Sequence, residues 1–127
     1  MARSTNPTSA APPPPGPFSQ HARVGSVVAV AGQVGVTSDG SVLDDVAKQT
    51  AQALRNVLAV VEAAGATEQD IVSVRVFLTD TEHFEEMNEV YATFFTKPRP
   101  ARTTVYVGLP AGLLVEIDAL AVLSPDG

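Results

Sequence analysis

The chain has 127 residues and a mass of 13.2 kDa, a length typical of one folded domain. Its formal net charge is −6, which disfavours binding to the phosphate backbone of a nucleic acid. The absence of cysteine excludes disulfides, a thiolate nucleophile and a Cys-ligated metal. No apolar run approaches the roughly 20 residues of a membrane span, so we expect a cytoplasmic protein that contacts no membrane.

The first 17 residues differ in composition from the rest of the chain. They contain Pro7, Pro12–Pro15 and Pro17 but hardly any bulky apolar residue. Such a segment cannot form a core and favours an extended polyproline conformation. We therefore expect residues 1–17 to be a flexible arm, with a ligand for an SH3-type domain as the alternative, and residues 18–127 to form a single domain.

Hydrophobic periodicity after Phe18 predicts the element order β-β-α-β-α-β-β. Apolar residues at spacings of three and four indicate the helices, and alternation or short apolar runs indicate the strands. The predicted strands cover 27–31, which 33–36 could continue after a bend at Gly32, and 71–78, 102–107 and 113–123. The predicted helices cover 44–64 and 81–95.

The simplest packing for these elements is a mixed sheet with both helices on one face, an α+β fold. In the strand over 71–78, Val72, Val74, Val76 and Leu78 share one face. The opposite face of the sheet also carries apolar residues and has no helix to cover it. An exposed apolar face of this kind predicts an oligomer.

Three polar residues interrupt otherwise apolar patterns. Glu116 lies between Val115 and Ile117 in the last predicted strand. It is either half of an ion pair or solvent-facing, or it is a carboxylate that orients a water, because an unpaired buried charge is costly. Arg102 is either a surface residue or a bidentate clamp for a small carboxylate. Asn88, on the apolar stripe of the second helix, is either a satisfied core amide or a donor in a pocket.

No phosphate-binding glycine loop, zinc-binding His motif or serine-nucleophile motif is present in the sequence. The two histidines, His21 and His83, lie far apart in the sequence, so neither a His-based metal site nor a catalytic triad is indicated. We therefore expect no metal and no cofactor.

The chain resembles the RidA/YjgF family, also known as the L-PSP family, over nearly its whole length after the Pro-rich arm. Each matching piece is short, but their order and spacing are specific. The pieces are Gly16–Gln20, Ala31–Gln33, Val60–Gly65, Val76–Asp80, Met87–Tyr91, Phe94-Phe95, Pro100–Arg102, Leu109-Pro110 and Val115–Ile117.

This resemblance implies a chorismate-mutase-like fold and a homotrimer whose three sheets pack into a central barrel. It implies sites in the clefts between subunits. The implied activity is hydrolysis of reactive enamines and imines, such as 2-aminoacrylate and 2-iminopropanoate, to 2-oxo acids and ammonia. No metal or organic cofactor is required for that reaction.

The resemblance also implies roles for individual residues. Arg102 matches the arginine that binds the substrate carboxylate, and Glu116 matches the carboxylate that positions or activates water. Asn88 matches a pocket asparagine, and Gly32 and Thr104 fall where backbone groups approach the substrate. The expected substrate-binding set is therefore Arg102, Phe18, Gly32, Asn88 and Thr104, with Glu116 and Arg102 as catalytic residues.

The sequence departs from the common family pattern at three positions near the expected site. Phe18 lies where Tyr is frequent, Ala31 where Ser is frequent and Thr104 where Cys is frequent. Two other functions stay open. One is a trimer that binds small carboxylates or protein partners without turnover. The other is an endoribonuclease, which the acidic charge and the absence of an evident His pair disfavour.

Overall fold

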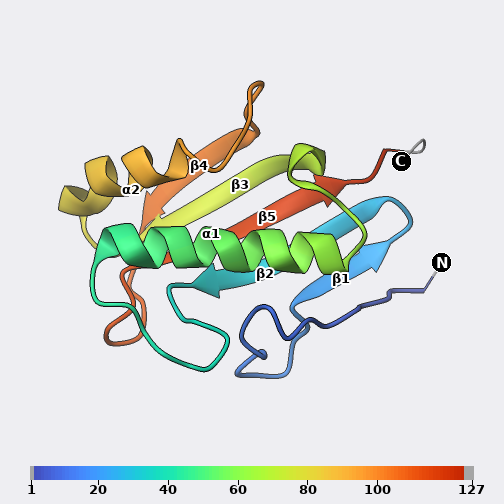
Figure 1. Cartoon of the computed structure of the whole chain (residues 1–127), viewed down its shortest axis with the longest axis horizontal. Helices are drawn as coiled ribbons and strands as arrows, with labels where there is room; N and C mark the ends of the chain where they lie inside the picture. The colour runs from blue at the N-terminus through green and yellow to red at the C-terminus, as the bar shows by residue number, and fades with distance from the viewer. Residues whose placement is uncertain (1, 125–127) are drawn as a thin grey trace.

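A five-stranded mixed sheet carries two helices on one face in the computed structural model, which describes residues 2–124 (Figure 1). This arrangement confirms the predicted α+β class and the order β-β-α-β-α-β-β. The strands are β1 (His21–Val24), β2 (Val27–Val34), β3 (Ile71–Leu78), β4 (Ala101–Tyr106) and β5 (Val115–Val122). The helices are α1 (Val46–Ala63) and α2 (Phe84–Tyr91), with short 3₁₀ turns η1 (Glu68–Asp70) and η2 (Thr81–His83).

The strands lie in the spatial order β1-β2-β5-β3-β4. All neighbouring pairs are antiparallel except β3 and β4, which are parallel. A parallel pair needs a crossover connection, and η2 with α2 supplies it over the helix-covered face. As a result β4 is an edge strand that lies beside α2 (Figure 1).

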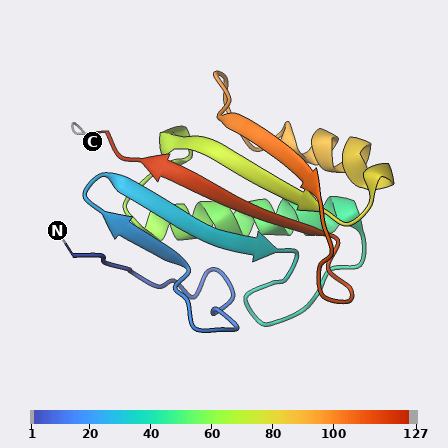
Figure 2. The ribbon, with the colours of Figure 1, turned by 180° about the vertical axis from the view of Figure 1, so that it is seen from behind.

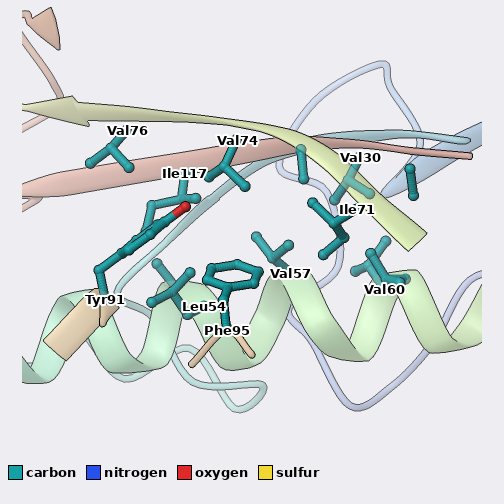
Figure 3. Close-up of a cluster of buried hydrophobic side chains, with 14 of the residues drawn as sticks. Val30, Leu54, Val57, Val60, Ile71, Val74, Val76, Tyr91, Phe95 and Ile117 are labelled. Atoms are coloured by element: carbon teal, nitrogen blue, oxygen red, sulfur yellow. The ribbon is translucent and has the colours of Figure 1, made fainter. Parts of the chain in front are cut away.

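The core lies between α1, α2 and the covered face of the sheet. Asp45 caps α1 by accepting a hydrogen bond from the Lys48 backbone N–H at 2.8 Å. From there α1 presents a buried apolar stripe to the sheet, and Tyr91 and Phe95 fill the space beside it with ring centroids 5.0 Å apart (Figure 3). The labelled core residues of Figure 3 are Val30, Leu54, Val57, Val60, Ile71, Val74, Val76, Tyr91, Phe95 and Ile117.

The first hairpin lies earlier in the chain than predicted. Its turn is at Gly25, which has a φ of 59°, so β1 precedes the first strand predicted at 27–31. That strand continues past a bend at Gly32, as the sequence allowed, and its pairing with β5 shifts register between Val30 and Gln33. A bulge at a glycine bends a strand without ending it.

The predicted face of Val72 was wrong. Val74, Val76 and Leu78 are buried beneath the helices, but Val72 is 46% exposed and Ile71 is buried. The cause is a register shift between Ile71 and Ser73 against β5, which inserts one extra residue and reverses the alternation.

The second helix is shorter than the predicted range 81–95. It begins with the 3₁₀ turn η2, and α2 ends at Tyr91. Beyond it, Thr93 and Phe94 donate backbone hydrogen bonds to the carbonyls three residues earlier, as in a tightening turn. This turn directs Phe95 into the core, where it is buried against Tyr91.

The described part of the Pro-rich segment, residues 2–17, lies along the domain beside β1 (Figure 1). Ser4 and Arg23 exchange backbone hydrogen bonds of 2.9 Å, and the Asn6 side chain donates to the Ala63 carbonyl at 2.8 Å. Ala11 is buried in the core cluster. The flexibility expected for this arm stays a prediction, but its path over the domain is defined by these contacts.

No helix within residues 2–124 covers the other face of the sheet (Figure 2), and many of the side chains on it are apolar. Five of its valine and leucine side chains are well exposed: Val27, Val72, Val105, Leu120 and Val122. Within this face Arg75 forms a bidentate ion pair with Asp118, with N–O distances of 3.0 and 2.6 Å. Among the described residues, no helix has the length and apolar character needed to cross a membrane.

Gln49 of α1 ties together two loops at one end of the sheet. Its side-chain nitrogen donates to the carbonyls of Leu43 and Gly112, both at 2.9 Å, and its oxygen accepts from the Leu114 backbone N–H at 2.8 Å. The Gln49 side chain is 1% exposed, so water cannot reach its amide to replace these hydrogen bonds. The loop before α1 and the loop before β5 therefore depend on one amide for their positions.

We expect Gln49→Leu to lower the free energy of unfolding by about 2–4 kcal/mol, because it removes three side-chain hydrogen bonds to the backbone groups of Leu43, Gly112 and Leu114. Urea denaturation at a fixed chain concentration measures this loss. The matched control is Gln69→Leu, at an exposed position in η1, which should change the stability by less than about 0.5 kcal/mol. Equal stability losses in the two variants would contradict the role assigned to Gln49.

Candidate active site

The six expected site residues form two groups on opposite faces of the sheet. Strand pairing places Arg102 opposite Val74, whose side chain is buried under the helices. It places Glu116 opposite Phe77, on the uncovered face. Because successive strand residues alternate between faces, the two side chains point away from each other within one chain.

The first group surrounds Arg102 between β4 and α2. The Nη1 atom of Arg102 donates a hydrogen bond of 2.8 Å to Oδ1 of Asn88. Its guanidinium lies 4.6 Å from the centroid of the Tyr91 ring and 5.7 Å from that of Phe84. Stacking on an aromatic ring and one hydrogen bond fix the plane of the guanidinium. Asn88 is thus a partner of Arg102 and not a core amide.

Thr104 lies two residues beyond Arg102 on the same face of β4, as expected from the alternation. Its hydroxyl oxygen is buried and has no hydrogen-bond partner among the described residues. A buried hydroxyl without a partner is uncommon in a folded protein. Thr104 therefore belongs to the Arg102 group by position, while its side chain makes no contact that orients Arg102.

The second group surrounds Glu116 on β5. The Glu116 carboxylate lies directly over Gly32 of β2, so closely that a Cβ at position 32 would overlap Oε2. Only glycine leaves room there for the carboxylate to lie against the backbone. At the bulge in β2, the Glu116 carboxylate thus packs directly against the backbone of Gly32.

A hollow of about 840 Å³ opens beside Glu116 and Gly32. Phe18 lies in its wall and is 51% exposed. The remaining lining comes from the Pro-rich arm, the end of β2, the loop before α1 and the loop before β5. Those residues are Pro12–Pro15, Gln20, Ala31, Gln33, Val34, Val36, Gly40, Val42, Pro110, Ala111 and Leu113.

Burial raises the pKa of the Glu116 carboxyl above its ordinary value, and the nearby negative charge of Asp118 raises it further. Both causes act in the same direction because each disfavours the ionised form. Once ionised, such a carboxylate is a stronger base than a solvated one. Its position beside a hollow therefore fits a group that accepts a proton from a bound water.

Three features of the two groups were not found by the sequence analysis. Tyr91 was placed in the core stripe of its helix, but its ring also supports Arg102, three residues along from Asn88. Pro12–Pro15 were assigned to a separate arm, but they line the hollow. Gln20, 4% exposed, holds that arm in place. The sequence carries no signal for this attachment, because the burial of Gln20 is visible only in the structure.

Among residues 2–124, no group of three or more His, Asp or Glu side chains is arranged to hold a metal ion. The chemistry available at the two groups is therefore that of a fixed guanidinium on one face and a half-buried carboxylate on the other. Because these two side chains lie on opposite faces of the sheet, a single chain does not bring them together.

Comparison with known proteins shows which family this chain belongs to. The family model described as endoribonuclease L-PSP matches residues 8–123, so the chain is a member of this family, the RidA/YjgF family predicted from the sequence. A RutC family protein of Pyrococcus abyssi is 40% identical over 95% of this chain and 98% of its own length. The 2-iminobutanoate/2-iminopropanoate deaminase of Salmonella typhimurium is 42% identical over 91% of this chain and 94% of its own. The crystal structure of RidA from Psychrobacter sp. matches with a TM-score of 0.91 and 35% identity, over 94% and 99% of the two chains.

We expect Asp118→Asn to lower the pKa of Glu116, because it removes the like charge that opposes ionisation. It also frees Arg75, whose positive charge then favours the Glu116 carboxylate. Carboxyl carbon chemical shifts followed by NMR between pH 3 and 8 measure the pKa of Glu116 in the wild-type protein and in the variant. An unchanged pKa of Glu116 in the variant would show that burial alone sets it.

Proposed function

We propose that this protein hydrolyses 2-imino acids, and the enamines in equilibrium with them, to 2-oxo acids and ammonia. The observation that carries the proposal is the pair of complementary half-sites: a guanidinium held flat by Asn88 and Tyr91, and a carboxylate of raised pKa held over Gly32 beside a hollow. The general reaction is supported by the relatives named as deaminases at about 40% identity.

We further propose that the working form is a homotrimer with its sites between subunits. The uncovered apolar face of the sheet gives each copy a surface to bury. Arg102 and Glu116 lie on opposite faces of the sheet, so a site that contains both residues needs two chains. In a closed ring of three copies, each contact would then join one Arg102 to one Glu116.

In the proposed reaction, Arg102 binds the substrate carboxylate and aligns the C=N carbon. Asn88 and Tyr91 act through Arg102 as positioning residues. Phe18, Gly32 and Thr104 complete the lining, with Phe18 and Gly32 from the chain that supplies Glu116 and Thr104 from the chain that supplies Arg102. The substrate thus lies across the contact between two copies.

Glu116 then acts as the general base. It accepts a proton from a water as the water oxygen bonds to the carbon of the protonated imine, which gives a carbinolamine. Glu116 passes this proton to the nitrogen. The ionised Glu116 then accepts the hydroxyl proton as the C–N bond breaks, so ammonia leaves and the C=O bond of the 2-oxo acid forms. The sequence of steps needs no metal and no organic cofactor, and its rate should rise with pH as Glu116 ionises.

We expect the wild-type chain to accelerate imine hydrolysis, and Arg102→Ala and Glu116→Gln each to lower kcat/KM by about 100-fold or more. Each change removes a charged group that contacts the reacting molecule. An amino-acid oxidase generates the imine in the assay, and semicarbazide competes with the enzyme for it. The lost semicarbazone signal measures the rate.

The matched control is Arg99→Ala, which removes a guanidinium three residues away that bonds to the Ala92 carbonyl and not to Asn88. It should keep at least half of the wild-type rate. If the wild-type protein binds a 2-oxo acid through Arg102 but hydrolyses no imine, the protein is a carboxylate-binding trimer and not a deaminase.

Mixing the two inactive variants tests whether the site is shared between chains. In trimers assembled at random from equal amounts of Arg102→Ala and Glu116→Gln chains, about one quarter of the contacts would pair an intact Glu116 with an intact Arg102. We therefore expect joint refolding to restore about a quarter of the wild-type rate, whereas mixing without subunit exchange should restore none. No recovery in trimers shown by mass spectrometry to be mixed would place both residues of each site in one chain.

A further inference from the structure

The hollow beside Glu116 is larger and more apolar than the carboxylate and imine groups of a substrate require. Its volume of about 840 Å³ falls in the range of pockets that enclose ligands much larger than 2-iminopropanoate, roughly 300–1,000 Å³. Apart from Glu116, the side chains in its wall that can form strong hydrogen bonds are those of Gln20 and Gln33.

The Gln20 amide is already engaged with the arm. Its oxygen accepts from the Thr8 backbone N–H at 2.8 Å, and its nitrogen donates to the carbonyls of Thr8 and Pro12 at 3.0 and 2.9 Å. With 4% of its surface exposed, Gln20 has little capacity left for a ligand. Its role is to hold the Pro-rich segment against the domain.

Pro12–Pro15 therefore form a fixed wall of the hollow. Proline has no backbone N–H, and its ring restricts the φ angle, so four in a row present a stiff apolar surface without a donor. Val34, Val36, Val42 and Leu113 continue the apolar lining. A polar side chain placed there would lose its hydration without gaining partners.

We propose that this hollow is the subsite for the substrate side chain, and that it selects 2-imino acids with branched aliphatic or aromatic side chains over those with a methyl or a charged side chain. The inference rests on the proposed function, because it uses Arg102 of a second copy to hold the carboxylate and Glu116 to face the imine carbon. It goes beyond that function in naming the side chain that the site accepts.

In the proposed trimer the hollow, of about 840 Å³, receives both Arg102 of a neighbouring copy and the substrate side chain. Arg102 must enter from the neighbour, which occupies part of the volume. Pro12–Pro15 and the valines of the lining belong to the same chain as Glu116. The apolar subsite therefore lies next to the base. Phe18, with its ring in the same wall, adds a further apolar surface.

Binding of stable 2-oxo acids to the full-length wild-type protein tests the inference independently of turnover. Isothermal titration calorimetry compares pyruvate, 4-methyl-2-oxopentanoate, phenylpyruvate and 2-oxoglutarate. We expect the branched and aromatic acids to bind about tenfold more tightly than pyruvate or more, and 2-oxoglutarate to bind no more tightly than pyruvate. Arg102→Ala should weaken binding of all of them, which places the ligands at the proposed site.

Two variants with matched controls locate the preference in the walls. Val34→Thr keeps the side-chain shape and adds a hydroxyl in the hollow, and Pro14→Ser opens the arm wall. Each should weaken binding of 4-methyl-2-oxopentanoate about fivefold and change that of pyruvate less than twofold. The controls, Val24→Thr and Pro7→Ser, make the same changes in β1 and in the arm but outside this hollow. They should leave both affinities unchanged.

The outcomes separate the two proposals. Pyruvate binding as tightly as the larger acids would overturn the side-chain subsite, and would mean that the neighbouring copy fills the hollow. Hydrolysis of the alanine-derived imine would then still support the deaminase. Tight binding of the larger acids without hydrolysis of any imine would overturn the deaminase and leave the subsite standing as that of a binding protein.

Discussion

The alternation of side chains along two strands of one sheet is the constraint on which this site depends. Hydrogen bonding between β3 and its two neighbours fixes Arg102 on the helix-covered face and Glu116 on the uncovered one. Moving either residue to the other face would require a one-residue slip that also reverses every core side chain of its strand. The strand register that buries the core side chains therefore also keeps the two charged side chains on opposite faces of the sheet. Any chemistry that uses both of them has to be shared between copies.

Neighbouring residues hold Arg102 and Glu116 in place on their two faces of the sheet. On one face, α2 connects β3 to β4, which brings Asn88 and Tyr91 to the guanidinium. On the other face, the bulge in β2 brings Gly32 under the Glu116 carboxylate. Gln49 joins the loops that form the rim of the hollow. A preorganised site needs such support because a small displacement of either charge loses the alignment.

Much of the fold could be predicted from the sequence, because long apolar periodicities determine helices and strands directly. The order of elements followed from them, and Arg102, Asn88 and Glu116 stood out as polar residues in apolar patterns. What failed depended on short or irregular segments: the bulge that exposes Val72, and the four-residue strand β1 that precedes the turn at Gly25. The place of the Pro-rich segment was hidden for another reason. Composition shows that it cannot form a core of its own, but not that buried Gln20 attaches it to one.

The low polarity around Glu116 affects two properties: the pKa of its carboxyl and the kind of side chain that the hollow favours. Removing water from the Glu116 carboxylate raises its pKa, which makes the ionised group a better acceptor for a proton from water. The same lack of water and of hydrogen-bond partners favours an apolar side chain over a polar one. Basicity and side-chain preference are therefore coupled: a polar substitution in the wall that widens the range of ligands would also stabilise the carboxylate and lower its pKa. Pro12–Pro15 contribute to the side-chain preference because they line the hollow without offering a backbone donor.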